Sequence, residues 1–275
     1  MKDIQVQMAV EHGLVKEADA LVAATDAFAQ TKALAAISIL ISQLVEPNIP
    51  SALDVPLIIS LLDSPDASVQ TGACNVLTGL MAADESQWRR LVLGVGLTSK
   101  LVAMLKAKPE SSGLRINLLA ALTLAAQGGE EGAAAVTEAD GLAPVLEACS
   151  SSGSEKVQEA VADLVCQLAS YEGLRAALSD AGAVPVLSGL LGVDEPEVVV
   201  RALMGLGMLL PGSEGNQRAL AGDQAAVRRL VALMTASADA DVKALSRDLF
   251  VGLTRSCKDE VAEAMRAASP TGTAS

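Results

Sequence analysis

The chain has 275 residues, of which 51% are hydrophobic, and it carries a formal net charge of −13. This much apolar material allows a sizeable buried core, so we expect a folded chain. Nucleic acid is excluded as a partner, because phosphate binding needs clustered Lys and Arg, which the sequence lacks. Apolar runs such as residues 33–44 are too short to cross about 30 Å of hydrocarbon, which excludes membrane insertion.

The amino terminus and the cysteines favour a cytoplasmic protein. Residues 1–11 contain Lys2, Asp3 and Glu11 and have no apolar segment of signal-peptide length. The four cysteines lie far apart and lack the CxxC spacing of zinc and redox sites, so we expect reduced, buried thiols and no metal. They are Cys74, Cys149, Cys166 and Cys257.

A short apolar block returns along the chain at the period of a helical repeat. The copies IISLL, LVAML, LEAC, LSGLL and LVALM start at Ile58, Leu101, Leu146, Leu187 and Leu230. The intervals between them are 43, 45, 41 and 43 residues. A period of about 40 to 47 residues is typical of stacked units of two or three helices.

Each block is preceded by a helix that ends in glycine and is followed by a polar turn and a longer helix. The preceding glycines, which favour sharp left-handed turns, are Gly13, Gly96, Gly141 and Gly182. The following helices carry apolar residues at helical spacing. These are Val69/Ala73/Leu77/Leu80, Val157/Val161/Val165/Leu168, Val198/Ala202/Leu206/Leu209 and Val242/Ser246/Phe250/Leu253.

This three-helix unit resembles the armadillo repeat, most clearly in SDAGAVPVLSGLLGVDEPEVVVRALMGLGMLLPGSEGNQRAL, residues 179–220. HEAT repeats are the nearest rival, but the glycine between the first two helices fits armadillo better. The resemblance implies an all-α, right-handed solenoid of about six repeats in a single domain over residues 1–268. We expect units at 1–46, 47–93, 94–138, 139–179, 180–221 and 222–268, and a disordered tail at 269–275.

Two irregularities affect the amino-terminal part. Residues 46–54 hold Pro47 and Pro50, so we expect the second unit to begin with a kinked or abbreviated helix. The chain also enters its first repeat without an evident polar cap. We therefore expect a partner or self-association to cover the amino-terminal repeat face.

In armadillo proteins the third helices line a concave face, where rows of Asn and Trp hold extended peptides. This sequence has neither row. The Asn positions hold Gly79, Leu124, Gln167, Met208 and Gly252, and the Trp positions hold Asn75, Ala120, Asp163, Met204 and Asp248. The resemblance therefore does not extend to the way in which nuclear import receptors hold basic peptides.

The same face carries apolar and acidic strips that predict a protein-binding groove. The apolar strips are Ile116/Ala120/Leu124 and Val200/Met204/Met208, the polar strip is Glu159/Asp163/Gln167, and Asn75 and Asp248 complete the set. Our hypothesis is that this groove takes an amphipathic helix or an apolar segment with some basic residues. The alternative is that a one-residue shift in register makes Met204, Met208 and Leu124 core residues, and that Asn75 is plain helix surface.

Catalytic signals are weak. His12 is the single histidine, so the sequence offers few of the residues that a catalytic nucleophile–histidine relay or a four-ligand zinc site needs. The glycine-rich stretches at 127–132 and 210–217 lack the order of phosphate-binding loops. We expect no cofactor and no enzyme activity. An enzyme is the third possibility, after the two binding functions described next.

The function expected from these patterns is a non-catalytic scaffold or adaptor that binds proteins, as a subunit of a larger assembly. Short armadillo-like proteins of cytoskeletal or ciliary complexes are one precedent for this family. The alternative is an exchange factor that clamps the nucleotide-binding domain of an Hsp70 chaperone.

Overall fold

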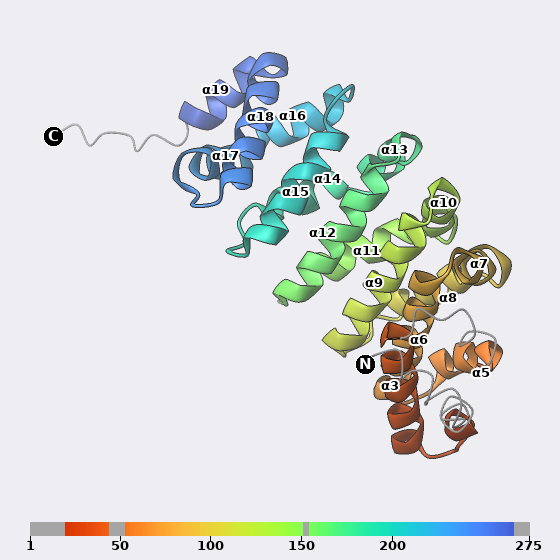
Figure 1. Ribbon diagram of the computed structural model, residues 1–275. Helices are drawn as coiled ribbons and strands as arrows, with labels where there is room; N and C mark the ends of the chain where they lie inside the picture. The colour runs from red at the N-terminus through yellow and green to blue at the C-terminus, as the bar shows by residue number, and fades with distance from the viewer. Residues whose placement is uncertain (1–19, 44–52, 151–153, 267–275) are drawn as a thin grey trace. The chain divides into compact units, whose positions relative to one another are not determined.

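The computed structural model describes residues 20–43, 53–150 and 154–266, and every regular element in these ranges is helical (Figure 1). This confirms the all-α prediction. The chain divides into two compact units, residues 1–141 and 142–275.

Several predictions fall outside the described residues or are not tested by them. Gly13, His12 and the tail at 269–275 lie outside, as do both prolines of the irregular segment. The repeat boundaries and the single domain over 1–268 stay predictions.

Unit 1 contains a long helix, then short helical pairs that alternate with further long helices. Its elements are α3 (Ala27–Gln43), α5 (Val55–Ser60), η1 (Leu61–Asp63), α6 (Ala67–Ala83), α7 (Glu85–Trp88), the π-helix η2 (Arg89–Gly94), α8 (Leu97–Lys106), α9 (Ser112–Gln127) and α10 (Glu130–Glu138). With six residues, α5 carries the start of the apolar block at Ile58, and the abbreviated start expected for the second unit falls mostly outside the described residues.

Unit 2 repeats the same succession. Its elements are α11 (Leu142–Ser150), α12 (Glu155–Ala169), η3 (Glu172–Leu174), α13 (Arg175–Asp180), α14 (Ala183–Leu190), α15 (Pro196–Leu209), α16 (Glu214–Gly222), α17 (Gln224–Ala236), α18 (Ala240–Ser256) and α19 (Lys258–Arg266). The last helix, α19, packs on α16 and α17.

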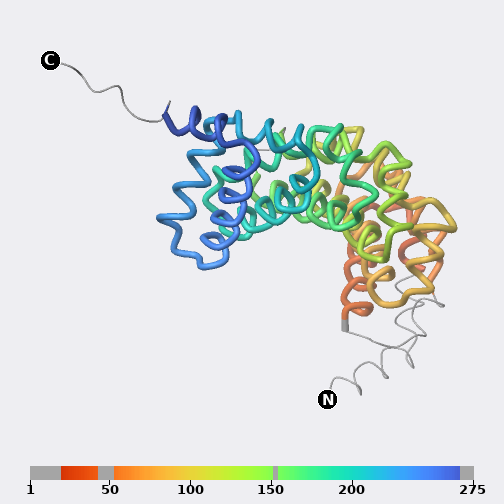
Figure 2. The backbone as a smooth tube through the Cα atoms, turned by 90° about the horizontal axis from the view of Figure 1, so that it is seen from above, coloured from red at the N-terminus to blue at the C-terminus, as the bar shows by residue number. Residues whose placement is uncertain are grey.

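The third helix of each repeat is the element around which the others pack. In unit 1, α6 lies between α3 and α9, and in unit 2, α15 lies between α12 and α18 (Figures 1 and 2). The apolar series predicted for these helices is buried throughout, except for Phe250, which is half-buried. Each fully buried Val or Leu contributes about 1.5–3 kcal/mol, so these rows hold neighbouring repeats together.

Short acidic side chains begin two of these helices. Asp66 precedes α6 and Asp239 precedes α18, and each carboxylate accepts hydrogen bonds from N–H groups two and three residues further on, at 2.8 to 3.1 Å. Such a cap pairs two of the four N–H groups that a helix leaves without partners at its start. The polar turns in the sequence therefore start the helices that follow them.

Glycine turns precede the second helices, with one difference from the prediction. Gly96 and Gly182 adopt left-handed backbone angles, with φ of 66° and 90°, at the starts of α8 and α14. At the third position the left-handed residue is Asp140, with φ of 55°, and not Gly141. Gly141 is needed for a different reason, because a Cβ there would lie 2.6 Å from the carbonyl oxygen of Val136.

The single tryptophan joins α7 to the turn between α9 and α10. Trp88 is buried, and its Nε1 donates a hydrogen bond to the carbonyl oxygen of Ala125 at 3.2 Å. Its ring lies directly against Gly128 and Gly132, where a Cβ would overlap ring atoms. Both glycines therefore make room for a side chain that lies about 40 residues earlier in the sequence.

We predict that Gly132→Ala lowers the free energy of unfolding by about 1–3 kcal/mol, because the new methyl group overlaps the Trp88 ring and the Ala125 carbonyl group. Chemical denaturation followed by circular dichroism measures the change. Gly113→Ala on α9 is the control, because its Cβ makes only ordinary contact with Ser111, at 3.7 Å. Equal stabilities of the two variants would contradict this packing.

Candidate protein-binding groove

All the predicted groove residues lie on third helices, and none of them is buried. Asn75, Ala120, Met204 and Asp248 are exposed, and the rest are half-buried: Ile116, Leu124, Glu159, Asp163, Gln167, Val200 and Met208. Met204, with 43% of its surface exposed, is among the most exposed large apolar residues of the described chain. Met204 is therefore a surface residue and not a core residue, whereas Met208 and Leu124 are partly buried.

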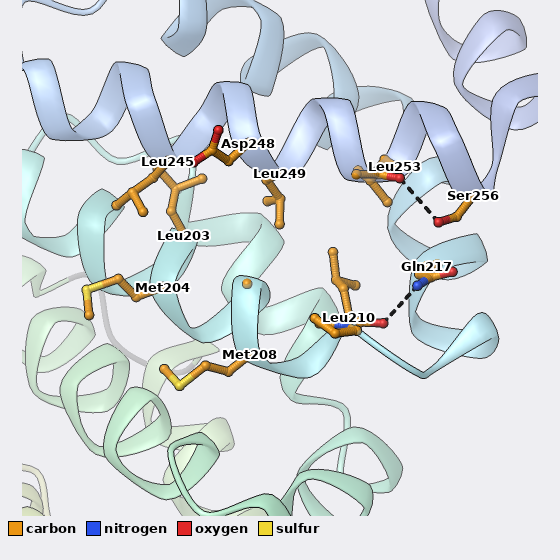
Figure 3. A pocket seen from close by; sticks show the side chains of 13 residues that line it. Leu203, Met204, Met208, Leu210, Gln217, Leu245, Asp248, Leu249, Leu253 and Ser256 are labelled. Carbon is orange, nitrogen blue, oxygen red and sulfur yellow. Dashed lines mark hydrogen bonds between the residues drawn. The ribbon is translucent and has the colours of Figure 1, made fainter.

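Unit 2 has an apolar groove of about 550 Å³ between α15 and α18 (Figure 3). Three predicted residues line it: Met204 and Met208 from α15, and Asp248 from α18. The other predicted residues do not. Asn75 lies on α6, and Ile116, Ala120 and Leu124 lie on α9, all in unit 1, whereas Glu159, Asp163, Gln167 and Val200 lie elsewhere on α12 and α15.

On α18, the sequence predicts Asp248 as a groove residue and places Gly252 at an Asn position of the concave face, but it does not predict Leu245, Leu249 or Ser256 as groove residues. Leu245, Leu249, Gly252 and Ser256 follow one another at helical spacing on this helix and line the groove. The i, i+4, i+7, i+11 pattern was a usable signal, but Leu249 is also buried against the core. A residue that serves both the core and the groove wall is not distinguished from a plain core residue by its spacing.

Two glycines widen the groove. Gly207 on α15 and Gly252 on α18 both line it, and a Cβ built on either would meet no atom within 4 Å. Neither residue has a left-handed backbone. Neither internal packing nor backbone geometry therefore requires glycine at these positions, although glycine inside a helix costs about 0.5–1 kcal/mol relative to alanine.

The polar lining groups differ in their hydrogen bonds. The side-chain amide of Gln217 donates to the carbonyl oxygen of Leu210 at 3.0 Å, and the hydroxyl group of Ser256 donates to that of Gly252 at 3.2 Å. Asp248 is the single charged residue among those that line the groove, and no hydrogen bond or ion pair joins its carboxylate to the described residues. The groove is thus apolar, with one free carboxylate at its edge.

The polar strip beside the groove is less acidic than its sequence indicates. Asp163 on α12 forms an ion pair with Arg201 on α15, with 2.9 Å between Oδ1 and Nη1. Gln167, one turn further on, donates a weak hydrogen bond to the hydroxyl group of Tyr171 at 3.5 Å. Of this strip, Glu159 is the residue whose charge no described ion pair neutralises.

The cysteines are poor nucleophiles. All four are free and buried. Burial raises the pKa of the Cys74 thiol to about 12 and that of Cys149 to about 11, because a thiolate is disfavoured away from water. The described residues contain no cluster of three His, Cys, Asp or Glu side chains that would hold a metal ion, and none of the described helices has the length and hydrophobicity needed to cross a membrane.

We predict that Gly207→Ala raises the free energy of unfolding by about 0.5–1 kcal/mol, because it removes a helix-destabilising glycine without creating an overlap. Gly205→Ala, two residues away on the same helix, is the control. Its Cβ would lie 2.8 Å from Cδ1 of the buried Leu187, so this variant should lose stability. Denaturation midpoints that shift in the same direction for both variants would contradict the placement of Gly207 in open space.

We predict that thiol titration lowers stability at high pH. The pKa of Cys74 is raised in the folded state. Its contribution to the free energy of unfolding is therefore complete below the ordinary pKa of 9.0, and it is lost as the pH rises from there towards 12. Above about pH 9 the wild type should lose roughly 1.4 kcal/mol per pH unit more than Cys74→Ala does. Denaturation curves at several pH values measure both slopes, and parallel slopes would show that the thiol does not titrate on unfolding.

No protein-family model and no curated protein matches the chain. Solved structures do match it. An engineered protein is 25% identical with a TM-score of 0.75, over 88% of this chain and 97% of that one. A designed armadillo repeat protein is 22% identical with a TM-score of 0.72, over 87% and 99% of the two chains.

A further designed armadillo repeat protein, in complex with the peptide (KR)4, is 21% identical with a TM-score of 0.71, over 86% of this chain and 99% of that one. Likeness at this level of identity establishes the fold and not the ligand. The chain therefore has the all-α solenoid fold of armadillo repeat proteins, as its repeat pattern indicates.

Proposed function

We propose that the chain is a non-catalytic protein-interaction scaffold that holds a helical or extended segment of a partner in the groove between α15 and α18. The observation that carries this proposal is the exposure of Met204 beside an apolar hollow of about 550 Å³. Exposed apolar residues gathered in a concavity are typical of contact surfaces, and methionine adapts its shape to different partners.

The fold supports a binding role. Repeat solenoids present long surfaces to other macromolecules, and they act mostly by binding. The designed relative in complex with (KR)4 supports a peptide segment as the class of ligand for this fold. In this chain the groove is apolar and lacks the Asn and Trp rows, so we infer a ligand different from a run of basic residues.

We infer further that the protein acts as a cytoplasmic subunit of a larger assembly, of which cytoskeletal and ciliary complexes are examples. Helix α3 supports this inference, because it exposes Phe28 by 70% and Ile39 by 55%. Apolar side chains exposed to this degree at the first described helix suit a face that another protein covers. The alternative role, nucleotide exchange on an Hsp70 chaperone, predicts faster nucleotide release from the purified chaperone.

We expect Met204→Glu and Met208→Glu each to remove a set of partners from the protein purified by affinity from its own cell type. A carboxylate in the apolar groove would be desolvated on binding, and loss of a central contact of this kind costs about 2 kcal/mol or more, roughly thirtyfold in affinity. Quantitative mass spectrometry of the co-purified proteins measures the loss, and circular dichroism verifies that the helices are intact.

Met265→Glu is the matched control. Met265 lies on α19 in the same unit, is 37% exposed and does not line the groove, so this variant should keep every partner. If Met204→Glu retains the same partners as Met265→Glu, binding takes place elsewhere on the molecule.

A further inference from the structure

The groove offers little to the backbone of an extended peptide. An extended segment leaves its N–H and C=O groups unpaired unless the receptor supplies partners, whereas a helix pairs them internally. Of the polar side chains that line the groove, Ser256 and one N–H of the Gln217 amide already donate to backbone carbonyl groups of their own unit, so only the rest of that single amide remains to pair with a peptide backbone. The Asp248 carboxylate can only accept hydrogen bonds and cannot donate to the carbonyl groups of a peptide. The lining therefore favours an occupant that satisfies its own backbone.

The groove has the geometry of a seat for a helix. It runs between α15 and α18, which pack on each other, and a third helix fits between two neighbours when its side-chain ridges enter their groove. The distance between packed helix axes, 8–10 Å in general, depends on the side chains at the contact. Gly207 and Gly252 lie on opposite walls of the groove and have open space beside their Cα atoms. A bound helix can therefore approach the backbones of α15 and α18 closely.

The carboxylate at the edge sets the charge of the occupant. A partner that covers Asp248 removes it from water, and burying a carboxylate without a counter-charge costs several kcal/mol. No described ion pair joins a cation to Asp248, and Arg201, on the opposing helix α15, is engaged by Asp163 at 2.9 Å and does not line the groove. The occupant must therefore bring its own Lys or Arg opposite Asp248.

From these three features we propose that the groove between α15 and α18 binds an amphipathic helix of a partner protein, with an apolar face and a Lys or Arg that pairs with Asp248. This inference rests on the proposed function and deepens it, because it names the conformation and the charge of the bound segment. It differs from the extended basic peptides that Asn and Trp rows hold.

Three matched peptide pools test the proposal against the full-length protein. The first contains peptides of about 18 residues, roughly 27 Å as a helix, with Leu, Ile, Phe or Met varied at i, i+3, i+4 and i+7 and Lys or Arg beside them. The second replaces each Lys or Arg by Glu. The third keeps the composition of the first but carries a central Pro, which breaks the helix. Display selection followed by fluorescence anisotropy measures affinity.

We expect binders from the first pool and none of comparable affinity from the other two. Asp248→Asn should weaken the best binder about tenfold, which corresponds to 1.4 kcal/mol. The control Asp259→Asn removes the same charge from an exposed residue on α19 and should leave affinity unchanged. In addition, Asp248→Lys should recover affinity for the version of that peptide in which Glu replaces the pairing Lys.

Gly252→Leu tests whether the groove between α15 and α18 is the binding site of the helix. Its Cβ meets no atom within 4 Å, so the variant should remain folded while its side chain fills the groove and abolishes binding of the helical peptide. Retention of affinity by this folded variant would overturn the proposal.

The remaining outcomes separate this inference from the proposed function. If the proline-containing peptides bind with the same affinity and Met204→Glu abolishes their binding, the groove binds partners but the inferred helical conformation of the bound segment is wrong. If the Glu pool binds equally well and Asp248→Asn has no effect, the charge pairing is wrong. If no pool binds, the inference falls, and the affinity purification with Met204→Glu decides the proposed function independently.

Discussion

Close approach between helices is the constraint on which the rest of this structure depends. Aromatic residues make up only 1% of the chain, so the repeats must be held together by Ala, Val and Leu side chains, which reach across short distances only. Small residues make this possible. Gly72 faces Leu34, where a Cβ would lie 3.0 Å from the leucine side chain, and Gly205 faces Leu187, where it would lie 2.8 Å away.

The same use of glycine on a different face of α15 produces the groove. Gly205 and Gly207 are two residues apart, about 200° around a helix with 3.6 residues per turn, so they lie on nearly opposite faces. Gly205 lets Leu187 approach, which strengthens the core, whereas Gly207 faces open space and leaves a hollow. One helix thus carries two glycines with opposite consequences, and only the first is explained by the stability of the fold.

The sequence predicts whatever depends on residues close together in the chain. The apolar series of the third helices follow from their spacing, and the structure places them as expected. The polar turns expected before these helices contain the caps Asp66 and Asp239. Features that join distant residues were not predicted. No local pattern indicates that Trp88 lies against Gly128, because that contact depends on the path of the chain between them.

The groove shows the same limit at the level of function. Met204 and Asp248 were predicted from one face of each helix, but the hollow arises only because α15 and α18 lie side by side with glycines on both walls. The ion pair that neutralises Asp163 could not be predicted from the sequence either, since Arg201 comes from the next repeat. Side-chain type and helical spacing identified exposed positions, and three-dimensional packing decided which of them share a cavity.

The distribution of charge is compatible with the proposed binding of a ligand in an apolar groove of an acidic protein. The net charge of −13 attracts basic partners in general, but at physiological ionic strength such attraction is screened over about 8 Å and does not orient them. Orientation requires a contact that is desolvated on binding. Asp248 is the one charged side chain that lines the groove. In the proposed complex, the apolar walls therefore supply the affinity and this carboxylate fixes the position of the bound segment.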